Sequence, residues 1–239
     1  MAPPTRHDPL PLILVVLTVT TGLVDAVSVL GLGRIFTANM TGNVVFLGFA
    51  IAGVPGFSVA RAVVSLVGFL VGAIIGGRLG VAMAGYSRRR WLLTVAVVEA
   101  GLLFAAAWVA IGYDLDTATP VTGLYAIIVL TAVAMGLRNA TVRRLAVPDL
   151  TTTVLTLTLT GIAADSALAG GSNLRWGYRL ASVVSIFAGA AIGAVLMSEG
   201  GLPLPLVVTG ACILLATVAY AVHPASRISA HEVRSGGLS

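Results

Sequence analysis

The sequence predicts an all-α integral membrane protein with six transmembrane helices and two short re-entrant segments, arranged as two inverted-topology repeats. Composition is the first observation behind this prediction. The 239 residues are 58% hydrophobic and 10% charged, whereas soluble domains are about 45–50% apolar and about 25% charged. Long apolar runs and a polar motif that recurs in the second half of the chain are the other two observations.

Six apolar runs are long enough to cross a bilayer, which takes about 20 residues in a helix. The first run follows Arg6 and His7 like the core of a signal peptide, but no small-residue cleavage site follows it, so we interpret it as a retained span. The six predicted spans are Leu10–Leu32, Ala62–Met83, Trp91–Tyr113, Val121–Ala140, Leu180–Met197 and Leu204–Val222.

Two further apolar runs, Asn39–Val54 and Thr151–Ala164, are shorter and more polar. If both crossed the membrane, the fourteen arginines would divide six to eight between its two sides. If both instead re-enter on one side, only Arg34 and Arg61 are external and the other twelve arginines are cytoplasmic or at the inner interface. Cytoplasmic loops of membrane proteins are enriched in basic residues. The sequence therefore predicts six spans with both termini in the cytoplasm.

The second half of the chain echoes the first. Gly136–Thr141 (GLRNAT) resembles Gly22–Val27 (GLVDAV), and the threonine-rich run Asp149–Thr156 stands where Thr37–Asn43 (TANMTGN) stood. We expect one transmembrane domain over residues 1–222, with repeats at about 10–113 and 121–222, and a flexible cytoplasmic tail at 223–239. Each repeat holds three spans and one re-entrant segment, so the second lies upside down, a design that recurs in secondary transporters.

Small residues recur every four positions in one span of each repeat. Such a stripe lets a neighbouring helix approach closely, so we expect a packing role. The stripes comprise Gly68, Gly72, Gly76 and Gly80 in the first repeat, and Ala181, Ser185, Gly189 and Gly193 in the second.

Both re-entrant segments begin with residues that favour helix N-termini. If those helices start near the midplane, their unpaired N–H groups and partial positive charges would favour an anion or a carboxylate-bearing solute. The alternative is that the polar side chains only pair with backbone inside a packed protein. The candidate residues at these starts are Asn39, Thr41, Asn43, Asp149, Thr151, Thr152, Thr153 and Thr156.

Two acids lie inside spans, where a carboxylate is costly and a functional role is the first hypothesis. Asp25 has Asn139 at the equivalent position of the second repeat, and Glu99 has Thr209. An acid on one side only suits proton or ion coupling. The alternative is a structural ion pair, for example between Asp25 and Arg138.

Other functions are not supported by the sequence. Its charges lie between apolar runs, which argues against nucleic-acid binding, and its single cysteine, Cys212, cannot form a disulfide within one chain. It contains no metal-ligand spacing and no nucleophile–base pair. We therefore expect no enzyme activity, no metal and no cofactor.

The motifs Gly22–Ser28, Phe36–Asn43, Arg138–Thr141 and Pro148–Thr153 together resemble the YoaK-like family of bacterial membrane proteins. The resemblance covers nearly the whole chain, and Asn39–Asn43 (NMTGN) is its most specific part. It implies a location in the cytoplasmic membrane of a bacterium. The family is classed as a domain of unknown function, so the resemblance assigns no role to any residue.

The function that these patterns favour is secondary transport or facilitated diffusion of a small solute, with an anion as the favoured class. Asp25 or Glu99 would couple it to protons. The alternative is a membrane scaffold that binds a partner and transports nothing, and a channel is a weaker third hypothesis. The expected partners are the lipid bilayer and the solute, and the sequence leaves the oligomeric state open.

Overall fold

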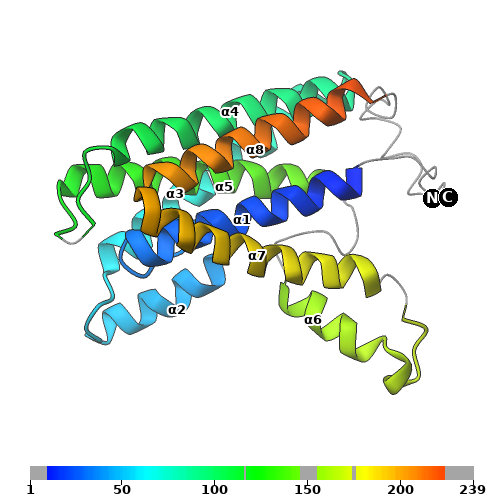
Figure 1. The fold of residues 1–239 in the computed structure, drawn as a ribbon, viewed down its shortest axis with the longest axis horizontal. Coiled ribbons are helices and arrows are strands. Elements are labelled where there is room, and N and C mark those ends of the chain that lie inside the picture. Colours follow the sequence, from blue (N-terminus) through cyan, green and yellow to red (C-terminus); the bar gives the residue numbers. More distant parts are fainter. Residues whose placement is uncertain (1–9, 116, 146–154, 174–175, 224–239) are drawn as a thin grey trace.

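The computed structural model describes residues 10–115, 117–145, 155–173 and 176–223. These residues form eight α-helices and one short 3-10 helix, with no strand among them. Six of the helices are long and apolar enough to cross a membrane, and they run along the long axis of the molecule (Figure 1). The six are α1 (Leu10–Gly31), α3 (Val59–Ala82), α4 (Arg88–Ala110), α5 (Val121–Leu145), α7 (Trp176–Gly200) and α8 (Pro203–Val222).

The prediction of six spans is confirmed, with differences at the helix ends. Helix α5 continues five residues beyond the predicted Ala140, to Leu145, and α7 begins at Trp176 rather than Leu180. Both extensions carry arginines, so they were not part of the apolar runs. A helix does not stop where the hydrocarbon layer ends, because its backbone hydrogen bonds also persist in the interfacial region.

Two short helices accompany the bundle. Helix α2 (Met40–Ile51) has 12 residues and α6 (Leu155–Ala164) has 10, so they are about 18 Å and 15 Å long at 1.5 Å per residue. That is about half of a hydrocarbon layer. Helix α2 packs on α3 and α6 packs on α7, and both lie on one side of the bundle, pointing toward its opposite ends (Figure 1).

Helices α3 and α5 pack along their length through glycines. A Cβ added at Gly72 would lie 2.1 Å from the carbonyl oxygen of Val133, and one added at Gly136 would lie 2.1 Å from that of Phe69. No side chain fits at such distances. The two backbones therefore touch only because both positions are glycine.

Helices α1 and α7 pack in the same way. A Cβ at Gly22 would lie 2.4 Å from the carbonyl oxygen of Ile186, and one at Gly189 would lie 2.0 Å from that of Val19. The buried stripe of α7 starts at Ser182 rather than at the expected Ala181, which is only half-buried. The remaining members of the stripe, Ser185, Gly189 and Gly193, are buried. Gly68, Gly76 and Gly80 are likewise buried on α3.

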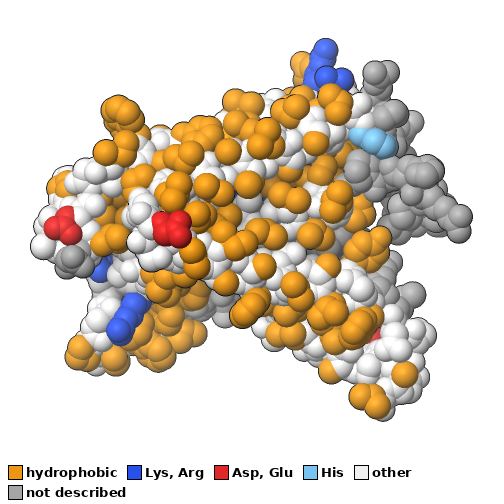
Figure 2. All heavy atoms as spheres, in the orientation of Figure 1, with side chains coloured by type: hydrophobic (Ala, Val, Ile, Leu, Met, Phe, Trp, Pro, Cys, Tyr) orange, Lys and Arg blue, Asp and Glu red, His pale blue; other side chains and the backbone are white. Residues whose placement is uncertain are grey.

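Apolar side chains cover most of the visible surface, and charged side chains gather near the two ends of the molecule (Figure 2). Trp108 and Phe187 are among the large apolar residues that remain exposed. Outward-facing apolar side chains are expected where a protein meets lipid tails. The predicted tail, apart from His223, lies outside the described residues.

Candidate functional site

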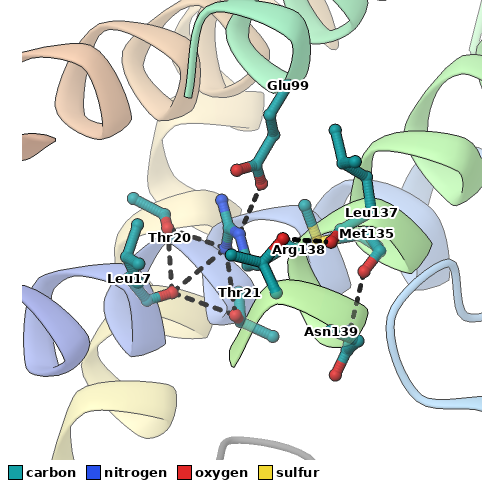
Figure 3. Close-up of polar contacts among 9 residues, drawn as sticks. Leu17, Thr20, Thr21, Glu99, Met135, Leu137, Arg138 and Asn139 are labelled. Atoms are coloured by element: carbon teal, nitrogen blue, oxygen red, sulfur yellow. Dashed lines mark hydrogen bonds and ion pairs between the residues drawn. The ribbon is translucent and has the colours of Figure 1, made fainter. Parts of the chain in front are cut away.

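Arg138 of α5 is buried in the middle of the helix bundle, with 2% of its surface exposed. Its Nε donates to Oε1 of Glu99 on α4 (Figure 3). Its Nη1 donates to α1, at 3.1 Å from the carbonyl oxygen of Leu17. The same nitrogen lies 2.9 Å from Thr20 Oγ1 and 3.1 Å from Thr21 Oγ1. One guanidinium thus links three helices.

One turn of α1 supplies three oxygen acceptors to this guanidinium. The hydroxyls of Thr20 and Thr21 each donate back to the carbonyl oxygen of Leu17, at 2.9 Å. Their lone pairs are then free to accept from Arg138. Sequence reasoning missed both threonines. The available signal was three threonines within four positions, Thr18, Thr20 and Thr21, inside a largely apolar span.

The partner of Arg138 is Glu99, and the alternative pairing with Asp25 is wrong. The side chains of Arg138 and Glu99 are only 2% and 3% exposed. Ions buried so deeply cost several kcal/mol each unless they are paired and hydrogen-bonded, as these two are. Asn139, the next residue of α5, points away from this pair and donates to the carbonyl oxygen of Met135 at 2.8 Å (Figure 3).

Asp25 is a second carboxylate near the same guanidinium. It lies half-buried on α1, one turn beyond Thr21, whose hydroxyl accepts from Arg138. Its Oδ1 is buried and has no hydrogen-bond partner among the described residues, and the same holds for Nη2 of Arg138. Two carboxylates and one guanidinium leave a surplus negative charge, which a proton or a small cation would neutralise.

This donor set suits a proton better than a transition metal. In the described part of the chain, no three residues of the types His, Cys, Asp and Glu come together as metal ligands. Glu99 already accepts from Arg138, whereas Asp25 has an oxygen available. The group of this cluster that is available to hold a proton or a small cation is thus the unpartnered oxygen of Asp25.

A small cavity adjoins the ion pair between α1, α4, α5 and α8. Its volume is about 30 Å³, which is room for one or two water molecules. Its polar lining comes from Glu99, Arg138, Thr141 and Thr217, and the rest is apolar. The cavity is too small for an organic solute, so in this conformation the ion pair is accessible to water at most.

Asn43 binds the loop before α2 to the bundle. Its Oδ1 accepts from the backbone N–H of Phe36 at 2.8 Å, and its Nδ2 donates to Phe36 O at 2.5 Å and to Ser65 Oγ on α3 at 3.1 Å. Ser65 Oγ also donates to Phe36 O, at 2.6 Å. Asn43 is the one residue of α2 that is buried. Its role in this structure is to hold the start of α2.

The other predicted residues at the short helices do not share this burial. Asn39 occupies the N-cap position of α2 but makes no side-chain cap bond, and both Asn39 and Thr41 are exposed. Thr156 is exposed on α6, where its carbonyl oxygen accepts from Thr160. Asp149, Thr151, Thr152 and Thr153 lie outside the described residues. The convergence of Asn39 and Thr41 with Thr151 and Thr153 stays a prediction.

The comparisons with known proteins place the chain in a family. The family model described as "Protein of unknown function (DUF1275)" matches residues 13–220. A relative in Bacillus subtilis (strain 168), the UPF0700 transmembrane protein YoaK, is 34% identical over 154 residues, which is 64% of this chain and 65% of that protein. No solved structure matches. The chain thus belongs to the DUF1275 family of YoaK-like membrane proteins, whose function is unknown.

Proposed function

We propose that this protein is a proton-coupled secondary transporter of a small solute in the cytoplasmic membrane of a bacterium. The observation that carries the proposal is the buried ion pair of Glu99 and Arg138 among six apolar helices, with the half-buried Asp25 one helical turn beyond Thr21 on α1. Ionisable side chains are expensive at membrane depth, and where they occur they mark ion, proton and substrate pathways. The resident ion pair leaves Asp25 as the proton-binding group.

The repeated packing supports an inverted-repeat transporter. The contact of Gly72 with Val133 recurs as the contact of Gly189 with Val19. The short helices α2 and α6 also occupy matching positions, one on α3 and the other on α7. We propose that both are re-entrant and start near the midplane, where their N–H groups would bind an anionic solute.

In the proposed cycle, Asp25 binds a proton when the site opens to the side of higher proton concentration. Protonation removes the surplus negative charge near Arg138, so an anionic solute can enter without meeting a second carboxylate. The proton bound at Oδ1 or Oδ2 of Asp25 leaves on the other side with the solute. Arg138 stays paired with Glu99 throughout, which keeps its charge from being stranded in the membrane.

Transport can be tested in proteoliposomes loaded with a pH-sensitive dye. Small organic and inorganic anions would be offered one by one, with and without an imposed pH gradient. We expect one class to acidify the lumen and Asp25→Asn to abolish that coupling. The matched control is Asn139→Asp, which adds an acid at the equivalent position and should leave coupling intact. If no anion class moves protons through the wild-type protein, proton-coupled anion transport is wrong.

Orientation is a separate part of the proposal. We propose that residues Arg88–Arg90 face the cytoplasm and residues 114–116 face outward, with both termini cytoplasmic. In a Cys212→Ala background, an impermeant thiol reagent added outside should label a cysteine at Thr117 but not one at Ser87. Cysteines at Arg34 and Ser58 should both react if α2 is re-entrant. Labelling of only one of these two would mean that α2 crosses the membrane.

The helix start itself can be tested through Thr41. Since the proposed ligands are backbone N–H groups rather than side chains, Thr41→Ser should leave solute affinity within about twofold. Thr41→Pro should remove most binding, because proline lacks the N–H donor. A large loss with Thr41→Ser would assign binding to the hydroxyl instead.

A non-transporting scaffold is the second candidate function, and the small cavity favours it. The cavity at Glu99 and Arg138 has room for only one or two waters. A scaffold needs no wet pathway between the two sides. Cysteines placed at Thr141 and Thr217 distinguish the candidates, since a transporter must expose at least one of them to a water-soluble reagent during its cycle. Persistent protection of both would favour the scaffold.

A further inference from the structure

Five arginines gather at one end of the bundle. We name this group the arginine cluster: Arg78 near the end of α3, Arg89 and Arg90 in the first turn of α4, and Arg143 and Arg144 in the last turn of α5. Arg89 is half-buried and the other four are exposed. In the part of the chain that the structure describes, none of the five forms an ion pair.

The fold brings the three helix ends together. Helices α3 and α4 are joined by a link of only five residues, 83–87. The end of α5 touches α3, since a Cβ at Gly80 would lie 2.7 Å from Nη1 of Arg144. The same end also packs toward α4, because Val142, Leu145 and Trp91 belong to one buried apolar cluster. The end of α5 thus lies between the other two, and its arginines join those of α3 and α4.

The start of α4 is electrostatically unfavourable without an anion. A helix N-terminus carries a partial positive charge, so arginines in its first turn oppose the helix dipole. Arg89 and Arg90 occupy this first turn, and the cap of Ser87, whose hydroxyl accepts from Arg90 N at 3.4 Å, adds no negative charge. An anion at this end would be stabilised by the exposed guanidinium groups and by the helix start together.

We propose that the arginine cluster binds the headgroup of an anionic phospholipid. Arginine forks match phosphate oxygens, and basic pockets between helix ends bind such headgroups. The surface beside the cluster suits acyl chains. Arg78 shares a face of α3 with Ile74 and Val81, which are 58% and 63% exposed, because residues three and four apart lie on one helix face. A free phosphate ion would make no use of that apolar face.

The opposite end of the molecule differs in charge balance. Among the residues that the structure describes, the arginines at this end are Arg34 and Arg61. The acidic residues Asp114 and Glu199 lie at or just beyond helix ends on the same side. Arg61 lies close to Gly33, and Arg34 lies close to Gly56. These two arginines provide a matched control, since the same number of positive charges can be removed there.

The test uses the purified full chain in a neutral detergent. Phosphatidylglycerol, phosphatidylcholine or inorganic phosphate is titrated in, and the thermal unfolding midpoint is recorded. A ligand that binds only the folded state raises this midpoint. We expect protection by phosphatidylglycerol and none by phosphatidylcholine. One arginine near an anionic lipid surface contributes about fivefold in affinity, so Arg89→Gln/Arg144→Gln should weaken binding about 25-fold.

Three results would contradict the proposal. Equal protection by both lipids would show that headgroup charge is irrelevant. Equal protection by millimolar inorganic phosphate would assign the site to a soluble anion. An equal loss in Arg34→Gln/Arg61→Gln would reduce the effect to net charge. If Arg89→Gln/Arg144→Gln does not fold, Arg90→Gln/Arg143→Gln takes its place, and retained lipid counted by native mass spectrometry gives a second readout.

Discussion

The contact between α1 and α7 and the contact between α5 and α3 are alike in backbone packing and unlike in charge. In both, a glycine from each helix lies against a carbonyl oxygen of the other, as Gly22 lies against Ile186 and Gly136 against Phe69. Two residues after Gly136 stands the buried Arg138. Two residues after Gly22 stands Val24, which is also fully buried.

The partner helices α4 and α8 differ in the same way. Helix α4 carries Glu99, which pairs with Arg138, whereas α8 carries Thr209, whose hydroxyl donates to Pro205 O on its own helix at 2.7 Å. The same close packing therefore forms once with a buried ion pair and once without one. The charges are therefore not needed to build this kind of glycine-mediated helix contact.

The largest effect should come from Arg138→Val, which gives α5 the residue that α1 carries at the equivalent position, Val24. Arg138→Val leaves Glu99 as an unpaired charge in the core, and breaking a buried pair in this way costs about 3–5 kcal/mol. We expect little folded protein, measured as the monodisperse fraction in size-exclusion chromatography and as the thermal unfolding midpoint.

A companion variant replaces both members of the ion pair by the residues at the equivalent positions of the other half, Thr209 and Val24. Glu99→Thr/Arg138→Val removes both charges, and we expect it to recover most of the stability lost in Arg138→Val. Transport should remain absent in this double variant. A double variant as unstable as the single one would mean that the ion pair is structural and that the two halves differ in how they pack.

The next largest loss of stability is expected from alanine substitutions in the glycine contacts of α3 with α5 and of α7 with α1. Gly72→Ala and Gly189→Ala each place a Cβ about 2 Å from a carbonyl oxygen, at 2.1 Å and 2.0 Å. Overpacking of this kind costs about 1–3 kcal/mol. We expect the two variants to lose similar stability in thermal unfolding. Gly77→Ala is the control, because nothing lies within 4 Å of its added Cβ, and a clear loss there would point to helix-wide effects.

A smaller loss of stability is expected at Asn43, and almost none at Asn39. Asn43→Ala leaves the backbone N–H of Phe36 without its partner, whereas the carbonyl oxygen of Phe36 still accepts from Ser65 Oγ, so we expect a loss of about 1 kcal/mol. Asn39→Ala should be nearly neutral, since Asn39 is exposed and makes no cap bond. Thermal unfolding of both variants checks the pair. Equal losses would show that Asn39 acts as a cap in solution.

The smallest effect on stability should come from Asp25→Asn, which gives α1 the residue that α5 carries at Asn139. Asp25 Oδ1 has no hydrogen-bond partner to lose among the described residues, so we expect a change in unfolding midpoint of at most about one degree, equivalent to about 0.25–0.5 kcal/mol. The dependence of transport on pH should disappear. A large loss of stability would instead show that Asp25 has a structural role in the folded protein.

The sequence by itself determined the helices and the small-residue faces. Six apolar runs became six long helices, and the fourfold spacing of Gly68 to Gly80 became the buried face of α3. Both properties are local, because the length of a span is set by the hydrocarbon layer and the face is set by the helical period. Membership of the YoaK-like family also follows from short local motifs, of which Asn39–Asn43 is the most specific.

Only the tertiary structure decided which polar groups meet. Arg138 pairs with Glu99 rather than with Asp25, and Asn43 binds a loop and α3 instead of opening toward a solute. These outcomes depend on how each helix is rotated about its axis and where it crosses its neighbours. Adjacent residues such as Arg138 and Asn139 lie about 100° apart around the helix axis. The close packing of the glycine faces fixes which of the two faces the other helices. Sequence spacing gives the faces of each helix, but packing selects the partner that each face receives.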